Sequence, residues 1–541
     1  MKLADSEAET LLGVATSMVG SKGLTSLCAY GSRVAGYARP DSDYDLLAVA
    51  RRFGEGVRYR YVDKPVAASV LVVEEGLLMD DATTSTLGEF AVGRFLNVYD
   101  PILNGEFLRK AELEYKRRVT LEALLELASD YGDFSRNLLI PYDYFLFSKL
   151  RKRAVIYPPA LYSYIQTYSC PSAPENREST LAGFREAAQG MKAAGFLIPE
   201  RDHVRIVPEK MKGDAFTKLS SLFSLTARGV TQYAVHGYAG RVGLGVFRRE
   251  ASSKIRRMRA SASTLPELDK PKSVLRLEEG AILADTAKID RQLAKLVGLE
   301  EFRSREKDLG EPTATTRVIT LESGDVKRSF VVKNFSDVRS LKWALLGFWA
   351  MAARKFSMTP IARLEREYRA SRQLRLQGIH TPKIVALALD ERVLVRDYVE
   401  GRSLSKIVDE ILHGGQEGLD KVEEFAETLV KAHAAGFGLG DTKASNVIVA
   451  QDGLYLTDLE QAVEGGDSAW DISEFLFYSG KFSVKEEGME RVARAFLAAY
   501  AKKGDPETIR EARKAKYFRP FQPFVMPGMS SLLKNLMSEY C

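Results

Sequence analysis

The sequence predicts a multidomain α+β protein. The chain has 541 residues, more than one hydrophobic core can serve, so we expect three or more domains. Hydrophobic residues make up 45% of the chain and charged residues 28%, as is typical of folded globular proteins. Segments with the two-residue period of strands alternate with segments at helical spacing. We therefore expect a succession of domains that combine sheets and helices.

Composition also limits the environment of the chain. No apolar run reaches the roughly 18 residues that span a bilayer, so we expect no membrane partner. The first residues, Met1 and Lys2 onward, lack the basic-then-apolar order of a signal peptide. Cys28, Cys170 and Cys541 are too few and too scattered for a disulfide framework, so we expect no disulfides. Together these features predict a cytoplasmic protein.

Residues 1–95 are expected to form the first domain. A strand ends in the turn Gly31-Ser32, and a second strand carries Asp43 and Asp45. The glycine lets the backbone approach a triphosphate, and the serine hydroxyl can donate to it. The two carboxylates project from one strand face and could hold two metal ions.

This unit strongly resembles the minimal nucleotidyltransferases of the DNA polymerase β superfamily. The resemblance implies an α/β domain and two-metal nucleotidyl transfer, which in that family uses a third carboxylate on a later strand. The matching strand, residues 65–73, contains none: Asp63 precedes it, and Glu74 and Glu75 follow it. We therefore expect a nucleotidyltransferase-like domain that has kept the fold and lost the chemistry. A second active enzyme is the alternative.

Residues 96–150 are expected to be a helical extension, because apolar residues recur there at helical spacing. This segment also carries clusters of basic residues at 109–110, 116–118 and 149–153.

Residues 151–212 predict a winged-helix-like domain. Helices are expected over 161–168 and 178–194, followed by a β-hairpin over 196–207. Helices followed by a two-stranded wing are typical of a winged helix, whose usual use is docking to nucleic acid or protein.

Residues 213–300 are expected to be a basic connector and linker. Within 241–259, seven basic residues stand against a single acid, Glu250. Because lysine and arginine neutralise phosphates, this run predicts an RNA-binding surface, although a solvated helix face has the same composition. The residues assigned to RNA binding are Arg241, Arg248, Arg249, Lys254, Arg256, Arg257 and Arg259.

The strongest motif in the chain begins at Asp441. Lys443 and Asn446 follow it closely, and a short β-hairpin then leads to Asp458. Asp441 could accept the proton of an attacking hydroxyl, and Lys443 could neutralise the migrating phosphoryl group. Asn446 and Asp458 could hold Mg²⁺ on the phosphates of ATP or another nucleoside triphosphate. The order and spacing predict a phosphotransferase.

A strand pair over 316–333 precedes this motif and ends in Lys333, which could reach the α- and β-phosphates. The helix that follows offers Glu367 as the partner of this lysine, with Glu365 as the less favoured neighbour. A hinge is expected near Arg396.

A phosphate-binding loop is harder to place. Gly310 is the best-placed glycine, and Gly280, further upstream, is the alternative.

In order and spacing, these motifs resemble the protein-kinase superfamily, and more narrowly the RIO-type and small archaeal atypical kinases. The resemblance implies a bilobal protein-kinase-like domain over residues 301–541. The usual histidine and arginine before the catalytic aspartate are Leu439 and Gly440, and Glu460 replaces the glycine of the metal-binding triplet. Only a dozen residues separate Asp458 from the Trp-Asp pair, too few for a phosphorylatable activation loop.

The combination of a nucleotidyltransferase-like domain, a winged helix, a basic connector and a RIO-like kinase is similar to the archaeal RNA kinases that phosphorylate a ribose 2′-hydroxyl of tRNA. This similarity implies a nucleoside triphosphate, Mg²⁺, and tRNA or another structured RNA as partners. Three alternatives stay open. They are an atypical Ser/Thr protein kinase recruited to a ribonucleoprotein, an active nucleotidyltransferase with a regulatory kinase domain, and a pseudokinase scaffold that only binds RNA.

Overall fold

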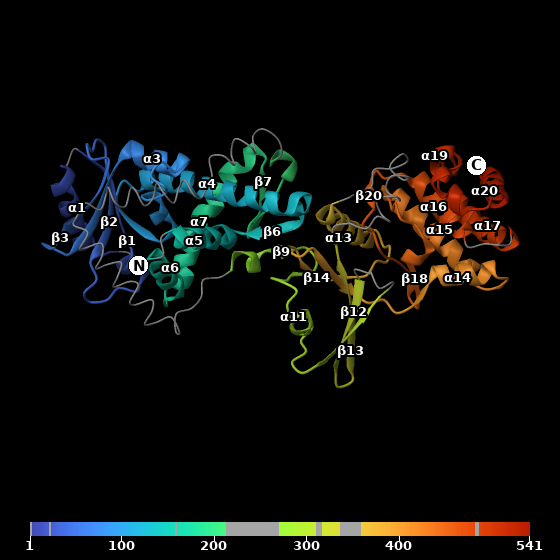
Figure 1. The fold of residues 1–541 in the computed structure, drawn as a ribbon. Coiled ribbons are helices and arrows are strands. Elements are labelled where there is room, and N and C mark those ends of the chain that lie inside the picture. The colour runs from blue at the N-terminus through green and yellow to red at the C-terminus, as the bar shows by residue number, and fades with distance from the viewer. Residues whose placement is uncertain are drawn as a thin grey trace. The chain divides into compact units, whose positions relative to one another are not determined.

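The chain forms two compact units, Met1–Glu278 and Glu279–Cys541 (Figure 1). The computed structural model describes residues 3–20, 23–156, 159–211, 270–309, 316–335, 359–481 and 486–541. Both units combine sheets and helices, so the prediction of a multidomain α+β chain is confirmed.

The first unit is built on a five-stranded sheet, which is followed in the chain by helices and a small four-stranded sheet. Its strands are β1 (Leu24–Tyr30), β2 (Tyr44–Ala50), β3 (Val57–Val62), β4 (Ala68–Glu74), β5 (Tyr99–Leu103), β6 (Leu138–Pro141), β7 (Leu197–Pro199), β8 (His203–Ile206) and β9 (Arg276–Leu277). Its α-helices are α1 (Asp5–Val19), α2 (Ser32–Ala35), α3 (Glu75–Thr84), α4 (Gly105–Tyr131), α5 (Tyr142–Ile156), α6 (Pro159–Ser169) and α7 (Ala173–Met191). Short 3₁₀ turns are η1 (Val92–Leu96), η2 (Gly132–Asn137), η3 (Lys192–Ala194), η4 (Pro208–Met211) and η5 (Pro271–Val274).

The five-stranded sheet has the order β3-β4-β2-β1-β5, with β2 and β4 parallel and the other neighbours antiparallel. Strands β2 and β4 are buried on both faces, which explains their near-continuous apolar runs. On one face, Leu11 and Val14 of α1 pack against Leu46 and Val70. The opposite face carries Asp45.

The small sheet has the order β7-β8-β6-β9. Its β7–β8 hairpin follows α6 and α7, so the expected helices and wing are present as elements. The sheet also includes β6, from the expected helical extension, and β9, from the expected connector. It therefore crosses both expected boundaries, at 150 and at 212. Expected boundaries are imprecise here because strands this short carry almost no periodic signal.

Several basic residues of the first unit turn inward. Glu89 forms ion pairs with Arg118 (3.0 Å), Lys149 (2.5 Å) and Arg153 (3.1 Å), and all four side chains are buried. Lys116 is fully buried in a separate ion pair. Two of the basic clusters noted in the sequence, at 116–118 and 149–153, therefore contribute much of their charge to the interior.

The second unit contains a six-stranded sheet, a mainly helical region and two smaller sheets. Its strands are β10 (Ala281–Ile282), β11 (Arg303–Asp308), β12 (Thr316–Ser323), β13 (Val326–Asn334), β14 (Ile384–Ala388), β15 (Val393–Asp397), β16 (Arg402–Ser403), β17 (Phe437–Gly438), β18 (Val447–Ala450), β19 (Gly453–Leu456) and β20 (Val463–Glu464). Its helices are α11 (Ile289–Leu296), α13 (Pro360–Leu376), α14 (Leu404–Leu412), α15 (Leu419–Ala434), α16 (Ser468–Gly480), α17 (Glu486–Lys503), α18 (Pro506–Ala512), α19 (Ala515–Phe518) and α20 (Pro527–Glu539), with 3₁₀ turns η6 (Ala444–Asn446) and η7 (Arg519–Phe524).

The second unit begins earlier than the boundary expected at residue 301. Strand β10 pairs in parallel with β14 at one edge of the six-stranded sheet, whose order is β10-β14-β15-β13-β12-β11. Leu293 of α11 is buried in the same apolar cluster as Ile319 of β12. Residues 279–300 therefore belong to this unit and not to a connector.

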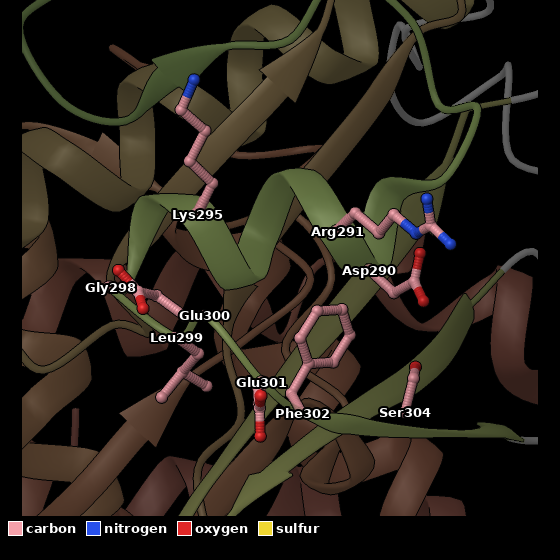
Figure 2. A pocket seen from close by; sticks show the side chains of 9 residues that line it. All are labelled: Asp290, Arg291, Lys295, Gly298, Leu299, Glu300, Glu301, Phe302 and Ser304. Atoms are coloured by element: carbon pink, nitrogen blue, oxygen red, sulfur yellow. The ribbon is translucent and has the colours of Figure 1, made fainter.

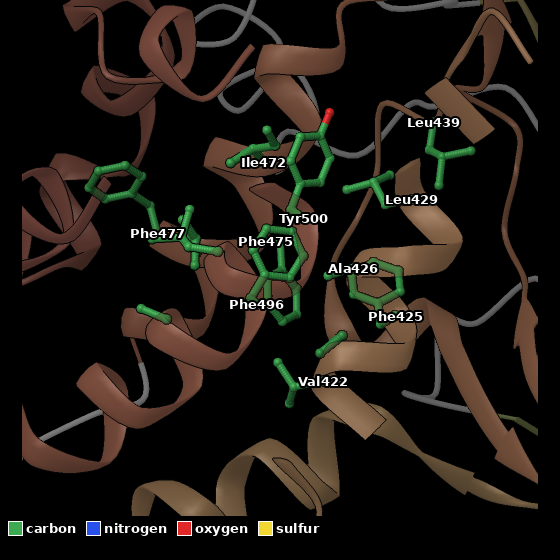
Figure 3. Packing of buried hydrophobic residues seen from close by; sticks show 14 of the residues in the cluster. Val422, Phe425, Ala426, Leu429, Leu439, Ile472, Phe475, Phe477, Phe496 and Tyr500 are labelled. Carbon is green, nitrogen blue, oxygen red and sulfur yellow. The ribbon is translucent and has the colours of Figure 1, made fainter. Parts of the chain in front are cut away.

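The mainly helical region of the second unit is organised around one apolar cluster. Phe425 and Leu429 of α15, Phe475 of α16, and Phe496 and Tyr500 of α17 lie together there (Figure 3). The same cluster includes Leu439, at the start of the segment that carries Asp441. That segment is thus attached directly to the core.

Cys28, Cys170 and Cys541 all carry free thiols. Within the described ranges, no helix combines the length and the apolar character that a bilayer crossing requires.

Candidate functional site

The segment from Leu439 to Asn446 joins β17 to β18, and side chains of α16 support it through hydrogen bonds. Asp471 of α16 is fully buried, and its carboxylate accepts hydrogen bonds from the backbone N–H groups of Leu439 and Gly440, each 2.6 Å long. Gly440 has a φ of 75°, in the left-handed region that a glycine adopts without strain. This conformation turns the chain so that both N–H groups reach one carboxylate.

Asp441 contacts both Lys443 and Asn446, the two residues that the sequence motif places near it. The Lys443 ammonium is 2.8 Å from Asp441 Oδ1, and the Asn446 amide donates to the Asp441 carbonyl at 3.1 Å. Burial raises the pKa of the Asp441 carboxyl, and the ammonium partly opposes that rise. A carboxylate with a raised pKa is a stronger base, as proton abstraction from a hydroxyl requires.

Glu474 also supports this loop. Its Oε2 accepts hydrogen bonds from the Thr442 backbone N–H (2.8 Å) and from the Trp470 indole N–H (3.2 Å). Burial, together with the nearby Asp441 carboxylate, raises the pKa of Glu474 to about 8. We did not predict this residue from the sequence. Its spacing from Asp471, one turn further along an apolar helix, is the signal that could have identified it.

Lys333 projects from β13 into a group of three carboxylates. Its ammonium is 2.6 Å from Glu367 Oε2 of α13 and 2.9 Å from Glu460 Oε2, and it also contacts Asp458 Oδ1. Glu367 is 1% exposed and Lys333 8%, whereas the Asp458 side chain is 38% exposed. Glu365 forms no ion pair with this lysine and lies within 4 Å of Arg369 instead. The cluster is therefore buried on one side and open at Asp458.

Two arginines complete this cluster. Arg396 of β15 donates to Glu367 Oε1 at 3.0 Å, and Arg363 of α13 makes two hydrogen bonds to Glu460, of 3.1 and 2.9 Å. We did not identify either arginine as a site residue from the sequence. Only Glu460 carried a usable signal, because it occupies the third position of the metal-binding triplet.

The charges in this cluster affect one another strongly. Burial alone would lower the pKa of the Lys333 ammonium, but Asp458, Glu367 and Glu460 outweigh it and raise that pKa. Burial alone would likewise raise the pKa of Asp458, but Lys333 and Arg396 outweigh it and hold that pKa below its usual value. Asp458 is thus an ionised carboxylate facing the solvent.

The carboxylates of Glu367, Asp458 and Glu460 could hold a metal ion, since one oxygen from each lies within 4.8 Å of the others. Asn446 is close by, because its carbonyl accepts the Thr457 N–H at 2.8 Å. Carboxylate and amide oxygens are the donors that Mg²⁺ prefers. Arginines also bind Glu367 and Glu460, whereas Asp458 is the most exposed of the three carboxylates, so Asp458 and Asn446 are the residues that fit Mg²⁺.

Gly310 lies outside the described residues. The strand ends that flank residues 310–315 are joined by a hydrogen bond from Leu309 N–H to the Thr316 carbonyl (2.9 Å), and Thr316 pairs directly with Lys333. Thr316, the first described residue after Gly310, therefore lies beside Lys333. The alternative, Gly280, packs instead against the backbone at Ile384, at the far edge of the sheet.

In the first unit, Gly31 and Ser32 form the turn between β1 and α2, and Asp45 lies in β2 with Asp43 just before it. A Cβ on Gly31 would lie 2.2 Å from Asp45 Oδ2, so the glycine is required by this carboxylate. The residue that pairs with Asp45 on the parallel strand β4 is Ser69.

The other carboxylates noted in the sequence do not replace it. Glu74, at the far end of β4, caps α3, and Glu75 accepts a hydrogen bond from Thr25. Asp63 is exposed beyond the end of β3. Among the described residues, no carboxylate occupies the position opposite Asp45.

The basic residues predicted to bind RNA, Arg241 to Arg259, lie outside the described residues, and so does the rest of the segment 212–269.

A surface hollow of about 910 Å³ lies away from all these residues (Figure 2). Its lining comes from α11 and from the loop that leads into β11, including Arg291, Lys295 and Phe302. None of the predicted site residues lines it. The hollow is therefore not part of the candidate site, despite its size.

The sequence matches no protein-family model. A curated relative is the KEOPS complex subunit Bud32 of Pyrococcus abyssi, which is 23% identical over 137 residues, or 24% of this chain and 61% of the relative. The chain thus spans about 61% of the length of that relative. The similarity supports an atypical kinase domain.

Two solved structures show weaker likeness. They are WaaP in complex with acyl carrier protein (TM-score 0.28, 12% identity, 48% of this chain and 98% of that chain) and the bifunctional kinase-methyltransferase WbdD (TM-score 0.26, 13% identity, 44% and 52%). At such TM-scores neither likeness carries an argument about fold or function.

Proposed function

We propose that this chain is a Mg²⁺-dependent kinase that transfers a phosphoryl group from ATP or another nucleoside triphosphate to a ribose 2′-hydroxyl in tRNA. The observation that carries the kinase part is the contact of Lys333 with both Glu367 and Asp458, on the same unit as the half-buried Asp441. A lysine held by a glutamate, a metal-binding aspartate and a catalytic base are the parts that phosphoryl transfer requires.

In the proposed reaction, Asp441 accepts the proton of the ribose hydroxyl. The hydroxyl oxygen forms a bond to the γ-phosphorus while the bond to the bridging β–γ oxygen breaks, and the nucleoside diphosphate leaves with that electron pair. Lys443, 2.8 Å from Asp441, places positive charge where the phosphoryl group crosses. Lys333 can orient the α- and β-phosphates, and Glu367 keeps it in place.

Asp458 and Asn446 would hold the magnesium ion, which supplies charge neutralisation to the phosphates when bound. Asp458 suits this role because it is ionised and the most exposed carboxylate of its cluster. When Asp458 binds a metal ion instead of Lys333, the lysine keeps Glu367 and Glu460 as partners.

The choice of RNA as acceptor is supported by two features. Only β20 and a short connection separate Asp458 from α16, which leaves little chain to build a platform for a peptide substrate. The first unit has a sheet that resembles that of a nucleotidyltransferase, but Ser69 lies opposite Asp45. This favours a domain that binds RNA without catalysing nucleotidyl transfer.

The test is to incubate the full chain with γ-labelled nucleotide, total RNA and total protein, and to see which pool acquires label. We expect label in tRNA that survives treatment with a protease and is lost with ribonuclease. Label only in protein would favour an atypical Ser/Thr protein kinase and would overturn the RNA proposal. Incorporation of α-labelled nucleotide into RNA would reveal an active nucleotidyltransferase.

A further inference from the structure

The end of the second unit contains a stretch of unusual charge. Residues 512–538 contain no aspartate or glutamate, although the whole chain has 72 acidic and 78 basic residues. Acidic residues are therefore nearly as common as basic ones elsewhere, and their absence over this length creates a local excess of positive charge. The basic residues of the stretch are Arg513, Lys514, Lys516, Arg519 and Lys534.

Four of these side chains form what we term the C-terminal basic surface: Lys514, Lys516, Arg519 and Lys534. Lys514 and Lys516 are 61% and 55% exposed, Arg519 is exposed and Lys534 is half-buried. The two lysines share one acidic partner, Glu511. Within the described part of the chain, no carboxylate lies within ion-pair distance of Arg519 or Lys534. Arg519 and Lys534 are thus available to a ligand, and Lys514 and Lys516 together face a single negative charge.

The segments that carry this surface pack against α16, the helix that supports the loop of Asp441. The Tyr517 hydroxyl donates to Asp467, the N-cap of α16, at 2.7 Å, and the ring of Phe521 lies 5.5 Å from that of Trp470. Trp470 in turn donates to Glu474, which accepts the N–H of Thr442. The basic surface and the loop of Asp441 are therefore both attached to α16.

A second set of contacts joins the two more directly. The Tyr478 ring has the Lys443 ammonium 5.4 Å from its centre and the Lys481 ammonium at 3.3 Å. On the preceding residue, Phe477 stacks against Phe518 at 5.8 Å, and Lys534 sits 3.4 Å from the Phe518 ring centre. Lys443 and Lys481 thus contact one residue of α16, and the neighbouring residue packs on the Phe518 ring that Lys534 contacts.

We propose that the C-terminal basic surface binds the phosphodiester backbone of the RNA that presents its hydroxyl to Asp441. This inference rests on the proposed function. An acceptor nucleotide within an RNA has charged phosphates on both sides, and these must pass within about one helix width of Asp441. Lysine and arginine that neutralise them release counterions, which supplies affinity without base recognition.

The experiment compares two quadruple variants of the full chain. The test variant is Lys514→Gln with Lys516→Gln, Arg519→Gln and Lys534→Gln. The control changes the same number of charges on exposed lysines of α14, α15 and α17, as Lys406→Gln, Lys431→Gln, Lys502→Gln and Lys503→Gln. Arg513 is left unchanged because its Nε is buried, so that its truncation would disturb packing.

Binding to a pool of unmodified tRNA transcripts is measured over a series of KCl concentrations. Each lost phosphate contact reduces the steepness of log Kd against log salt by about 0.7 to 0.9, so the test variant should lose about 3. Its KM for tRNA should rise at least about tenfold, and the loss should appear in KM rather than kcat because these residues do no chemistry. The control should stay within about twofold of the wild type.

A test variant with wild-type affinity and salt dependence would overturn the inference, and so would a control that weakens binding equally. If the quadruple variant fails to fold, the pairs Lys514→Gln/Lys516→Gln and Arg519→Gln/Lys534→Gln replace it. Each pair should then account for about half of the change in slope. Failure of the wild type to label any RNA would overturn the proposed function, whereas the binding series decides on the surface independently of catalysis.

Discussion

Each unit contains a cluster of ion-paired side chains, but one cluster is closed to solvent and the other is open on one side. In the first unit, no member of the cluster around Glu89 is more than 7% exposed. In the second unit, Lys333 is 8% exposed while its partner Asp458 is 38% exposed. The two clusters are otherwise similar, since each combines lysine, arginine and carboxylates from separate elements.

The difference in solvent exposure limits what each cluster can do. A closed cluster must keep all its partners, because removing one leaves a buried charge without compensation. The open cluster can exchange a partner: Asp458 can turn to a metal ion while Lys333 remains paired with Glu367 and Glu460. We therefore interpret the first cluster as structural and the second as the place where a nucleotide and its metal ion enter.

The largest expected effect is on catalysis in the open region. Asp441→Asn and Asp458→Asn should each reduce phosphotransfer by on the order of 10²- to 10⁴-fold or more, because they remove the proposed base or a proposed metal ligand. Both substitutions keep the shape of the side chain. The measurement is kcat with labelled nucleoside triphosphate and tRNA.

Thermal unfolding serves as the control, and the midpoints should stay close to that of the wild type. A well-folded Asp441→Asn variant that retains most of its activity would contradict the assignment of the base.

The next effect concerns the closed cluster. Glu89→Gln leaves Arg118, Lys149 and Arg153 without their shared carboxylate, which should cost roughly 3–5 kcal/mol of unfolding free energy. Urea unfolding of the first unit measures this loss. The kcat of the folded protein should not change, because no residue of this cluster belongs to the proposed site.

Glu178→Gln is the matched control, because it removes an exposed ion pair with Arg185 and should cost at most about 1 kcal/mol. Equal losses from the two variants would mean that the cluster around Glu89 is not a closed network.

The candidate site was largely predictable because its residues fall in one recognisable order. The spacing of Asp441, Asn446 and Asp458 along one segment can be read directly, and Lys333 ends an alternating strand. The contact of Arg396 with Glu367 was not predictable in the same way. It depends on β15 lying next to β13 in the sheet, which local pattern does not specify.

The fold was less predictable where side chains depart from the usual patterns. All six residues of β11 are exposed and five of them are charged, so no apolar alternation marks this strand. Lys116 and Arg118 were noted as basic, but their burial depends on carboxylates that α4 and other elements bring to them. Composition identifies a charged residue, and only the packing decides whether its charge faces water.

A smaller effect should appear in the pH dependence of stability. Burial raises the pKa of Glu474 from 4.5 to about 8, so between these values the folded protein binds more protons than the unfolded chain. The contribution of Glu474 to stability should therefore be greatest at low pH and fall as the pH rises towards 8. Glu474→Gln does not titrate, and its amide oxygen can still accept the Thr442 and Trp470 N–H groups.

The melting temperatures of Glu474→Gln and wild type, measured across this range, should diverge as the pH rises, with the variant the more stable at pH 8. Parallel curves would contradict a buried, protonated Glu474.

The smallest effect is expected at the other carboxylate pair. Asp43→Ala combined with Asp45→Ala should leave kcat for phosphotransfer within about twofold, although it removes both acidic residues of the nucleotidyltransferase-like motif. Ser69 pairs with Asp45 across β2 and β4, so the third carboxylate that two-metal chemistry needs is replaced by a hydroxyl at that point. The same assay with α-labelled nucleotide should detect no nucleotidyl transfer by the wild type. Transfer that is present in the wild type and lost in the double variant would contradict this expectation, because it would require a metal site completed by a residue other than Ser69.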